Sequence, residues 1–464
     1  MSTPAREARR IRRVLIANRG EIAVRINRTC RDLGLETVQV YSEADRESLA
    51  VKLADRAVCI GGPRSADSYL DMSVLIKAAK AFQADSVHPG YGFLSENPAF
   101  AALCSAQGLT WIGPCADVIR LMGNKAAARK AAADAGLNTT PGSIGVVTDW
   151  QQAASVAENV GYPIILKASA GGGGRGMRLV TAGAGMKDAF ADAQREAQAA
   201  FGDGALYVEK FLTRVRHVEV QVLGDETTAL HLWERDCSTQ RRNQKLVEES
   251  PAFGLSEALR RQMCNAAAEL SQSVGYTSAG TIEFIVDVDA GKFYFMEMNT
   301  RIQVEHPVTE MVLGVDLVER QIRIAQGDGV GMAQEDVACA GHAIECRINA
   351  EDPSKGFAPS PGTIESYRAP GGPGIRIDTH AFQGYTVPPY YDSLIAKVIA
   401  WGSDRNQAIR RMRRALQEMR VDGVETTIAF HRKLLRDPTF RQGNVYTRYI
   451  EQEFLPREFP PDDG

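Results

Sequence analysis

The sequence contains no apolar run long enough to span a bilayer, and it has little excess charge of either sign. Its 464 residues carry 54 Lys and Arg against 57 Asp and Glu, a formal net charge of −3. The first absence argues against a membrane-spanning helix, and the near-balance of charge argues against a broad nucleic-acid-binding surface. We therefore expect neither a membrane nor a nucleic acid as a partner.

Paired cysteines are also absent. The eight cysteines are scattered singly, without a Cys-x-x-Cys pair, which argues against a zinc site or a disulfide framework and favours a reducing compartment. Several arginines lie near the N-terminus, but residues 14–17 already read as a core strand, so no apolar export segment fits before them. We therefore expect a cytoplasmic protein with a short solvated tail.

Two common nucleotide-binding fingerprints are missing. No Gly-x-Gly-x-x-Gly follows the first predicted strand, so NAD or FAD is not inferred, and the glycine run at 171–174 lacks the Gly-Lys-Ser/Thr ending of a Walker loop. Four successive glycines still allow several backbone N–H groups to converge on a phosphate. Because the run joins two apolar segments, it predicts a flexible hairpin lid, with a disordered linker as the alternative.

Strand and helix signals divide the chain into three regions, within the range expected for its length. Residues 1–121 alternate short apolar strands with helical segments, which predicts a parallel α/β sheet. Residues 122–340 contain the glycine run, with the candidate lid at about 139–212. Residues 341–455 are a turn-rich β section followed by helical sequence. The predicted fold class is therefore mixed, α/β and α+β.

The clearest helical pattern in the third region covers residues 403–419. Its apolar positions form one stripe that we interpret as core packing. Ser403 is the expected N-terminal cap, and Gly423 is the expected stop signal.

The most informative stretch is 281–307. Two β-branched and aromatic runs flank a turn through Gly291, a pattern typical of a hairpin. Folding it sets Glu283 roughly opposite Glu297, and facing carboxylates repel unless a cation neutralises them. Asn299 projects from the same face, and such oxygen ligands suit magnesium or manganese. A solvated face of a β-ribbon is the alternative.

Polar residues continue beyond this hairpin. Arg301, Gln303 and Glu305 extend the alternation, so we expect them on the same face; this set suits binding a phosphate and activating a small anion. Residues 234–245 carry four cationic groups and predict an anion site, with a charged surface loop as the alternative. Cys237 is interpreted as a structural thiol, because no base is spaced to activate it.

Together these segments resemble biotin carboxylase, a family of the ATP-grasp superfamily. The resemblance covers nearly the whole chain and implies three lobes: an N-terminal Rossmann-like α/β lobe, an ATP-grasp centre with a glycine-rich lid, and a C-terminal α+β lobe. The segments that carry it occur in the family's order and are Ile16–Ala23, His88–Glu96, Lys167–Arg178, Glu234–Lys245, Glu297–Glu310, Glu345–Pro353 and Tyr390–Ser393.

The resemblance also implies a role for individual residues. Two Mg²⁺ or Mn²⁺ ions would be held by Glu283 and Glu297, with Asn299 assisting. Glu305 would be the general base, and Arg347 would steady the biotin enolate. The bicarbonate site would consist of Lys245, Arg301, Gln303 and the backbone of Val304. ATP would be bound by Lys125, Lys167, Gly171, Gly172, Gly173, Gly174, Met177, Glu209, Lys210, Phe211, Leu212, His217, Gln240 and Asn243.

Two positions depart from the family pattern. Asn243 stands where the family usually has histidine; asparagine keeps hydrogen-bonding capacity but cannot carry a proton. Pro373 stands where a bulky aromatic is common at the family's dimer contact, so a homodimer and a monomer are both left open.

The implied reaction is ATP- and bicarbonate-dependent carboxylation of biotin through carboxyphosphate, the first half-reaction of an acetyl-CoA or other acyl-CoA carboxylase. No Ala-Met-Lys-Met biotinylation motif occurs, and no transcarboxylase region follows Arg457. We therefore expect a separate biotin carboxyl carrier protein and a carboxyltransferase. The alternatives are another ATP-grasp ligase, a component of a pyruvate- or urea-type carboxylase, and a nucleotide-binding regulatory subunit.

Overall fold

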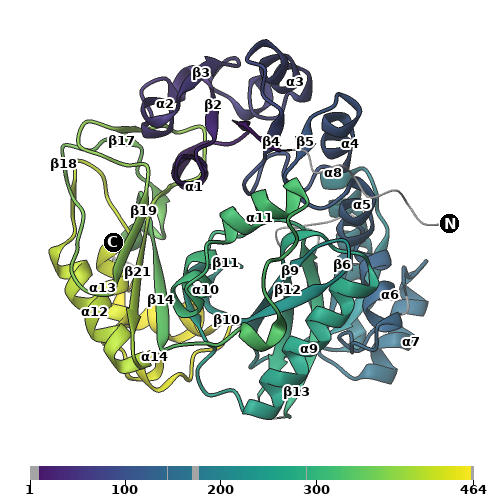
Figure 1. Cartoon of the computed structure of the whole chain (residues 1–464). Helices are drawn as coiled ribbons and strands as arrows, with labels where there is room; N and C mark the ends of the chain where they lie inside the picture. The colour runs from purple at the N-terminus through teal and green to yellow at the C-terminus, as the bar shows by residue number, and fades with distance from the viewer. Residues whose placement is uncertain (1–9, 144, 170–176, 289, 461–464) are drawn as a thin grey trace.

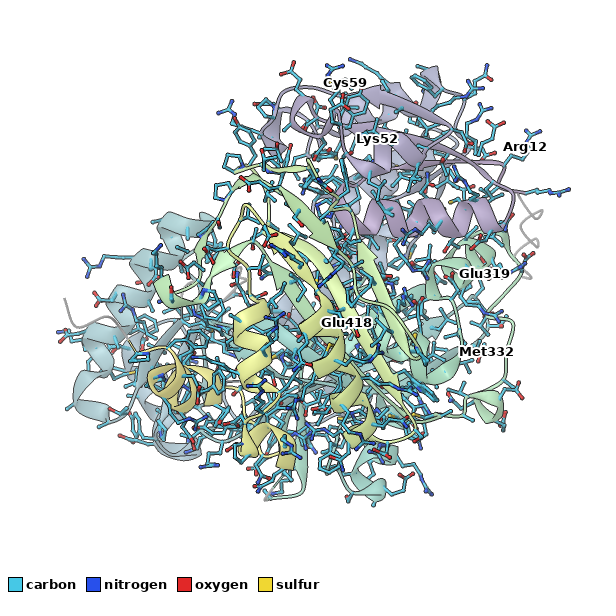
Figure 2. All side chains as sticks on the ribbon, turned by 90° about the vertical axis from the view of Figure 1, so that its left-hand side faces the viewer. Arg12, Lys52, Cys59, Glu319, Met332 and Glu418 are labelled. Carbon is cyan, nitrogen blue, oxygen red and sulfur yellow. The ribbon has the colours of Figure 1, made fainter. Side chains whose placement is uncertain are left out.

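The structure is a computed structural model that describes residues 10–143, 145–169, 177–288 and 290–460. In Figure 1 the N-terminal lobe lies at the top, the C-terminal helices at the lower left and the middle of the chain at the right. Across these described ranges, no helix is both long and apolar enough to cross a membrane. All eight cysteines are free, and the exposed Cys59 lies at the outer end of the N-terminal lobe (Figure 2).

The N-terminal lobe is built on a five-stranded parallel sheet with the order β3-β2-β1-β4-β5, which confirms the predicted parallel sheet. Its central strands β2, β1 and β4 are largely buried, with hydrophobic clusters on both faces of the sheet. The strands are β1 (Arg13–Ile16), β2 (Glu36–Tyr41), β3 (Arg56–Cys59), β4 (Ser86–His88) and β5 (Thr110–Trp111). The helices are α1 (Gly20–Asp32), η1 (Glu43–Asp45), α2 (Leu49–Leu53), η2 (Ser65–Asp67), α3 (Met72–Ala81), α4 (Pro98–Ala106) and α5 (Ala116–Gly123).

A small three-stranded antiparallel sheet, β7-β6-β8, follows with a hydrophobic cluster of its own. Strands β6 and β7 pair antiparallel with Lys167 opposite Met177, as the hairpin prediction requires. The predicted phosphate-binding glycines Gly171–Gly174 lie outside the described residues. The elements are α6 (Lys125–Asp134), α7 (Trp150–Val160), β6 (Ile164–Ala168), β7 (Met177–Val180), η3 (Gly183–Gly185), α8 (Met186–Phe201) and β8 (Leu206–Lys210).

One eight-stranded antiparallel sheet, β13-β12-β9-β10-β11-β14-β21-β19, runs through the rest of the molecule. Its strands are β9 (Arg216–Gly224), β10 (Ala229–Arg241), β11 (Gln244–Ser250), β12 (Ser278–Asp287), β13 (Lys292–Asn299), β14 (His342–Asn349), β19 (Ile375–Thr379) and β21 (Leu394–Gly402). The sequence predicts that a new region starts near residue 341. Strand β14, which follows this boundary, nevertheless pairs directly with β11. The pairing satisfies the backbone groups that an open β11 edge would leave exposed.

Helices and short ladders complete the fold around this sheet. The helices are α9 (Glu257–Ser273), α10 (His306–Leu313), α11 (Leu317–Gln326), η4 (Gln334–Asp336), η5 (Pro353–Lys355), α12 (Arg405–Glu418), α13 (Ile428–Leu434), α14 (Pro438–Gln442), η6 (Ile450–Phe454) and α15 (Leu455–Glu458). The ladders pair β15 (Glu351–Asp352) with β16 (Ala358–Pro359), β17 (Gly362–Thr363) with β20 (Thr386–Val387), and β18 (Ser366–Arg368) with β22 (Arg420–Asp422).

The predicted hairpin is present as β12 and β13, and Glu283 pairs with Glu297 in its register. The prediction that strand alternation continues to Glu305 is wrong, because β13 ends at Asn299 and residues 300–305 form no strand. The chain instead turns into α10, which begins at His306. This turn, and not the pleat of a strand, brings Gln303 against Glu283.

Helix α12 is present, but the predicted N-terminal cap, Ser403, and the predicted stop signal, Gly423, are wrong. The apolar stripe is buried as expected, but the N-cap is Asp404, whose Oδ1 accepts the N–H of Gln407 at 2.8 Å. The helix ends at Glu418, and the next residues form β22, so Gly423 is not its stop signal.

We expect Asp404→Ala to lower the free energy of unfolding by about 1 kcal/mol, because it removes this N-cap acceptor. Ser403→Ala should change it by less than about 0.5 kcal/mol, since a surface substitution away from a cap has little effect. Urea denaturation of both variants measures the difference. Equal losses would contradict the assignment of Asp404 as the cap.

Candidate active site

A cavity of about 1190 Å³ is lined by residues from every part of the fold. It takes side chains from the N-terminal lobe, the small β6–β8 unit, the large sheet and the C-terminal strands. Every described residue that the sequence predicted for the site lines it. These residues are Lys125, Lys167, Met177, Glu209, Lys210, Phe211, Leu212, His217, Gln240, Asn243, Lys245, Glu283, Glu297, Asn299, Arg301, Gln303, Val304, Glu305 and Arg347.

The outer part of the cavity is formed by β6, β8 and the segment after β8. The Lys167 ammonium forms an ion pair with Glu209, which also accepts from Arg129. The Lys210 amine donates to the carbonyls of Gly161 and Tyr162, at 2.9 Å each. Lys210 can therefore offer a ligand its backbone groups, while its amine is already used.

Lys245 is the centre of charge in the inner part. Its Nζ donates to Glu219 Oε2 at 2.6 Å, Glu283 Oε1 at 2.8 Å and Glu305 Oε1 at 2.6 Å. Burial opposes the charged form, but the carboxylates around it hold the pKa of Lys245 well above its ordinary value. One ammonium thus joins three acidic side chains from β9, β12 and the segment before α10.

Glu305 is held between two cations. Its other oxygen accepts from Arg347 Nη2 at 2.9 Å. Burial alone would raise the pKa of Glu305, but Lys245 and Arg347 outweigh it and hold that pKa well below its ordinary range. The carboxylate is therefore ionised at neutral pH and able to accept a proton in the cavity.

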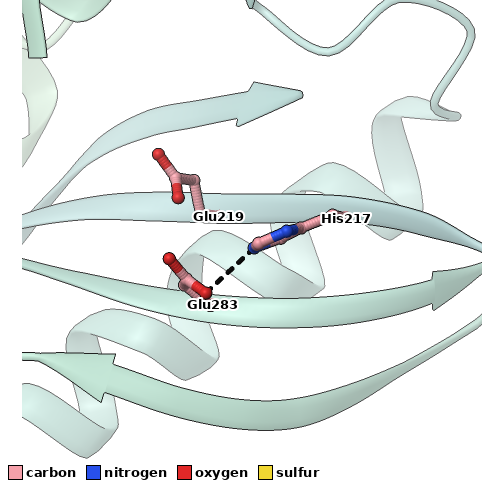
Figure 3. Close-up of side chains that lie close together, drawn as sticks. All are labelled: His217, Glu219 and Glu283. Atoms are coloured by element: carbon pink, nitrogen blue, oxygen red, sulfur yellow. Dashed lines mark ion pairs between the residues drawn. The ribbon is translucent and has the colours of Figure 1, made fainter. Parts of the chain in front are cut away.

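His217 contacts the same cluster from β9. Its Nε2 lies 3.0 Å from Glu283 Oε2, and Figure 3 marks this ion pair. Burial lowers the pKa of His217, but the charge of Glu283 outweighs burial and raises it above its ordinary value.

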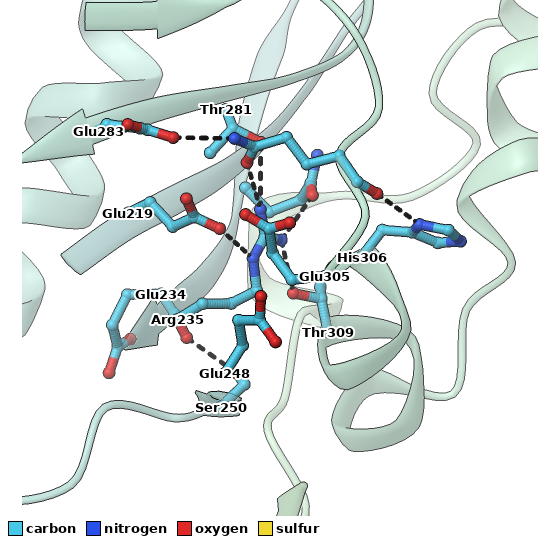
Figure 4. A network of polar contacts seen from close by, with 12 residues as sticks. Glu219, Glu234, Arg235, Glu248, Ser250, Thr281, Glu283, Glu305, His306 and Thr309 are labelled. Carbon is cyan, nitrogen blue, oxygen red and sulfur yellow. Dashed lines mark hydrogen bonds and ion pairs between the residues drawn. The ribbon is translucent and has the colours of Figure 1, made fainter. Parts of the chain in front are cut away.

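A fully buried arginine, Arg235, donates hydrogen bonds to side chains of this cluster. Arg235 donates to Glu219 Oε1 at 2.6 Å and to Gln303 Oε1 at 3.0 Å; Figure 4 shows it among these side chains. The Gln303 amide in turn donates to Glu283 Oε1 at 2.8 Å. Arg235 therefore orients the side-chain amide of Gln303, a residue that the family resemblance places in the bicarbonate site.

Arg301 is positioned by the N-terminal lobe. Its Nε donates to Glu96 Oε2 at 2.9 Å and its Nη2 to Asn299 Oδ1 at 3.0 Å. The segment at 88–98, rich in Gly and Pro, thus supplies an acidic partner for the site.

The residues predicted to hold metal fit a hard cation. Glu297 faces Glu283 in the register, and among the described residues no hydrogen bond or ion pair joins its carboxylate. Burial and the neighbouring charge of Glu283 raise the pKa of Glu297. A divalent cation would relieve this repulsion, and Asn299 adds an amide oxygen.

A second group of possible ligand atoms consists of His217, Glu219 and Glu283, which lie within 4.8 Å of one another. Glu219 and Glu283 both accept hydrogen bonds from Lys245. Since the ammonium already lies between them, we favour the Glu297 side of Glu283 as the cation site.

The local backbone explains why asparagine is favoured at position 243. It forms, with Arg242, the turn between β10 and β11, and the two residues have φ values of 63° and 47°. Two central residues with positive φ are typical of a type I′ turn, where asparagine is favoured.

Sequence reading missed four acidic or basic partners: Glu96, Glu219, Arg235 and Glu248. For Glu219 a signal existed, because it lies two residues after His217 on β9 and so shares its face. Glu248 lies on β11 and contacts Arg347 only because β14 pairs with that strand. No pattern in the sequence indicates that pairing.

Three family models match successive parts of the chain. The biotin carboxylase N-terminal domain matches residues 10–119. The ATP binding domain of the carbamoyl-phosphate synthase L chain matches residues 124–332, and the biotin carboxylase C-terminal domain matches residues 345–452.

Relatives and solved structures agree with these matches. A biotin carboxylase from Nostoc sp. is 54% identical over 441 residues, which cover 95% of this chain and 98% of the relative. A biotin carboxylase–β,γ-ATP complex from Campylobacter jejuni has a TM-score of 0.93 and 46% identity, covering 96% of this chain and 99% of that one.

The third comparison is a dimer of the biotin carboxylase domain of Hydrogenobacter thermophilus 2-oxoglutarate carboxylase, in complex with MgADP, ADP and bicarbonate. Its TM-score is 0.92 with 48% identity, covering 96% of this chain and 98% of that one. The family models, the relatives and the fold agree over nearly the full length: this chain belongs to the biotin carboxylase family.

Proposed function

We propose that this chain uses ATP and bicarbonate to carboxylate the biotin of a separate carrier protein. The observation that carries the proposal is the ion-pair chain Lys245–Glu305–Arg347 at the inner part of a cavity that Lys167, Arg301 and Gln303 also line. A carboxylate ionised between two cations, beside further anion-binding groups, suits deprotonation of a small anion next to a nucleotide.

In the proposed reaction, bicarbonate binds to Arg301, Gln303 and the backbone of Val304, near Lys245. Glu305 accepts the bicarbonate proton while a bicarbonate oxygen attacks the γ-phosphorus of ATP. ADP leaves, and carboxyphosphate forms. The cations Lys245 and Arg301 offset the charge that builds on the transferring groups.

Carboxyphosphate then releases carbon dioxide beside the biotin ureido nitrogen. The phosphate formed with it takes the N–H proton of that nitrogen, and Arg347 stabilises the resulting biotin anion, which attacks the carbon dioxide. Water must be excluded meanwhile, since carboxyphosphate hydrolyses readily, and this is the role we propose for the β6–β7 hairpin as a lid.

Nucleotide binding is assigned to the outer part of the cavity. Lys125, Lys167 and the run Gly171–Gly174 would contact phosphates, and Glu209–Leu212, His217 and Gln240 would surround the rest of the nucleotide. Glu283 and Glu297, with Asn299, would hold two Mg²⁺ or Mn²⁺ ions, which supply electrostatic neutralisation of the phosphates when bound.

A biotin carboxyl carrier protein and a carboxyltransferase are the proposed partners, and a homodimer is proposed from the dimeric domain described above. Acetyl-CoA or another acyl-CoA is the proposed final acceptor. The 2-oxoglutarate carboxylase among the relatives is the reason to test 2-oxo acids as well. Eight free cysteines support a reducing, cytoplasmic location.

The test is ATP hydrolysis with Mg²⁺, measured with and without bicarbonate and with and without a high concentration of free biotin. The proposal predicts ADP release that requires bicarbonate and is stimulated by biotin. Turnover indifferent to both would favour another ATP-grasp ligase, and ATP binding without turnover, even with an added carrier protein, would favour a regulatory subunit.

A further inference from the structure

Two glutamates behind Arg347 have no role in the reaction described so far. Glu248 on β11 and Glu345 on β14 are direct partners in the register of the two strands. Directly opposite residues of an antiparallel pair project from the same face with their side chains close together. Both side chains are fully buried, so two carboxyl groups face each other away from water.

Glu248 is bound to Arg347. The Arg347 Nε donates to Glu248 Oε1 at 2.6 Å, while its Nη2 donates to Glu305 Oε2 at 2.9 Å. The guanidinium therefore bridges the proposed base and Glu248. The second oxygen of Glu248, Oε2, is buried and has no hydrogen-bond partner among the described residues.

Glu345 has still fewer partners. Neither of its oxygens has a hydrogen-bond partner in the described part of the chain. The cation that acts most strongly on Glu345 is Lys397, opposite Arg347 on β21, but its ammonium donates to the Val304 carbonyl at 2.8 Å and lies 3.1 Å from Glu21. An ionised carboxylate buried without a donor is strongly disfavoured.

We propose that Glu345 is protonated in the working enzyme and donates to Glu248 Oε2, so that this carboxyl pair positions Arg347 against Glu305. The inference rests on the proposed function for its catalytic consequence, and on burial and strand register for its geometry. One proton leaves one negative charge on the pair, matched to the one guanidinium that Glu248 contacts.

The local electrostatics support this assignment. Burial raises the pKa of Glu345 well above its ordinary range, more than Lys397 lowers it. Burial also raises the pKa of Glu248 to about 7, against the opposing effect of Arg347. The ionisable groups that interact with the pair from the packed strands and from the segment before α10 are Cys237, Lys245, Glu305, Cys346, Arg347 and Lys397.

The pH dependence follows from the sign of these shifts. A buried carboxyl whose pKa is raised in the folded state keeps its proton to a higher pH than an exposed one, and loses it as the pH rises further. Two adjacent negative charges then repel, and Glu248 no longer holds Arg347 in place. Biotin-stimulated turnover should therefore fall on the alkaline side of its pH profile.

Glu345→Gln is the main test, because the amide keeps the size and the donor of the protonated acid but does not titrate. We expect its biotin-stimulated kcat at pH 7 to stay within about threefold of the wild type, and the alkaline limb of its pH profile to shift upward or disappear. Glu248→Gln should lower that kcat by about 100-fold, as misplacement of a catalytic group does, with the KM for ATP nearly unchanged. Superimposable pH profiles of Glu345→Gln and the wild type would overturn the proposal.

Thermal stability supplies a readout that does not depend on catalysis. Glu249 is the matched control: it is the neighbouring buried glutamate on β11, but it accepts from Arg405 at 2.6 Å and from His342 at 2.8 Å. Glu249→Gln should lower Tm clearly at pH 7. Glu345→Gln should leave Tm unchanged there and gain on the wild type as the pH rises, because only the wild type must ionise the buried group.

Failure of the Glu345 proposal can be distinguished from failure of the proposed function. A wild type without biotin-stimulated turnover would refute the proposed function, while the stability comparison would still decide whether Glu345 is protonated. A Tm loss in Glu345→Gln as large as that in Glu249→Gln, or failure of Glu345→Gln to fold, would show that the ionised form is needed and would overturn the proposal.

Discussion

Replacing Glu305 with glutamine is expected to reduce bicarbonate-dependent ATP turnover by about 10²- to 10⁴-fold, the usual contribution of a positioned general base. The glutamine keeps the size of the side chain, but its single oxygen can accept from only one of Lys245 and Arg347, which Glu305 contacts through its two oxygens at 2.6 and 2.9 Å. It cannot take the bicarbonate proton. Steady-state ADP release at saturating bicarbonate measures the loss.

Nucleotide binding should survive this change, because Glu305 lies at the inner part of the cavity while Lys167 and Glu209 lie at the outer part. ATP affinity within about threefold of the wild type, measured by calorimetry, is the control. Glu305→Asp supplies a graded comparison, since it keeps the carboxylate but withdraws it from its partners; it should retain more turnover than the glutamine. Unchanged turnover in Glu305→Gln would refute the assignment of the base.

Lys245→Gln is expected to abolish turnover and also to lower the free energy of unfolding by about 3–5 kcal/mol, as when one partner of a buried ion pair is removed. Glu219, Glu283 and Glu305 all accept from this ammonium, so the variant leaves three buried carboxylates without their shared cation. Urea denaturation measures the stability, and ADP release measures the rate.

The stability deficit should depend on pH. Lys245 helps to hold the pKa of Glu305 well below its ordinary range, so the stability it contributes is present above the unfolded pKa of about 4.3 and is lost as the pH falls through the lower folded value. The gap between wild type and Lys245→Gln should be complete at neutral pH and shrink in acid.

Lys130→Gln is the matched control for lost charge. Lys130 pairs with Asp134 at 2.8 Å on the exposed face of α6, and such a pair contributes about 0–1 kcal/mol. A loss in Lys245→Gln no larger than in Lys130→Gln would contradict the view that one ammonium stabilises the buried cluster.

The local parts of the site could be predicted from the sequence. Folding about the Gly291 turn placed Glu283 roughly opposite Glu297, as observed, but the register that starts at the turn would pair Glu283 with Met296. A bulge between Glu283 and Phe284 shifts the register by one residue and makes the Glu283–Glu297 pair. The family resemblance selected residues that all line one cavity, wherever the structure describes them.

Contacts between distant strands could not be predicted. Lys245 contacts Glu219 and Glu305, 26 and 60 residues away, and their approach depends on the order of strands in the eight-stranded sheet. The same order sets Glu248 beside Glu345. A single sequence contains local turn and periodicity signals, but no signal for which distant strands become neighbours.

The central claim is that a bicarbonate oxygen attacks the γ-phosphorus of ATP, and oxygen transfer tests it most directly. ATP would be turned over with biotin in the presence of bicarbonate labelled with ¹⁸O, under conditions where exchange with water is slow, and the phosphate produced would be analysed by mass spectrometry. Our account predicts that one labelled oxygen from bicarbonate appears in each phosphate formed. Phosphate without the label would show that water attacks instead, and would contradict the account.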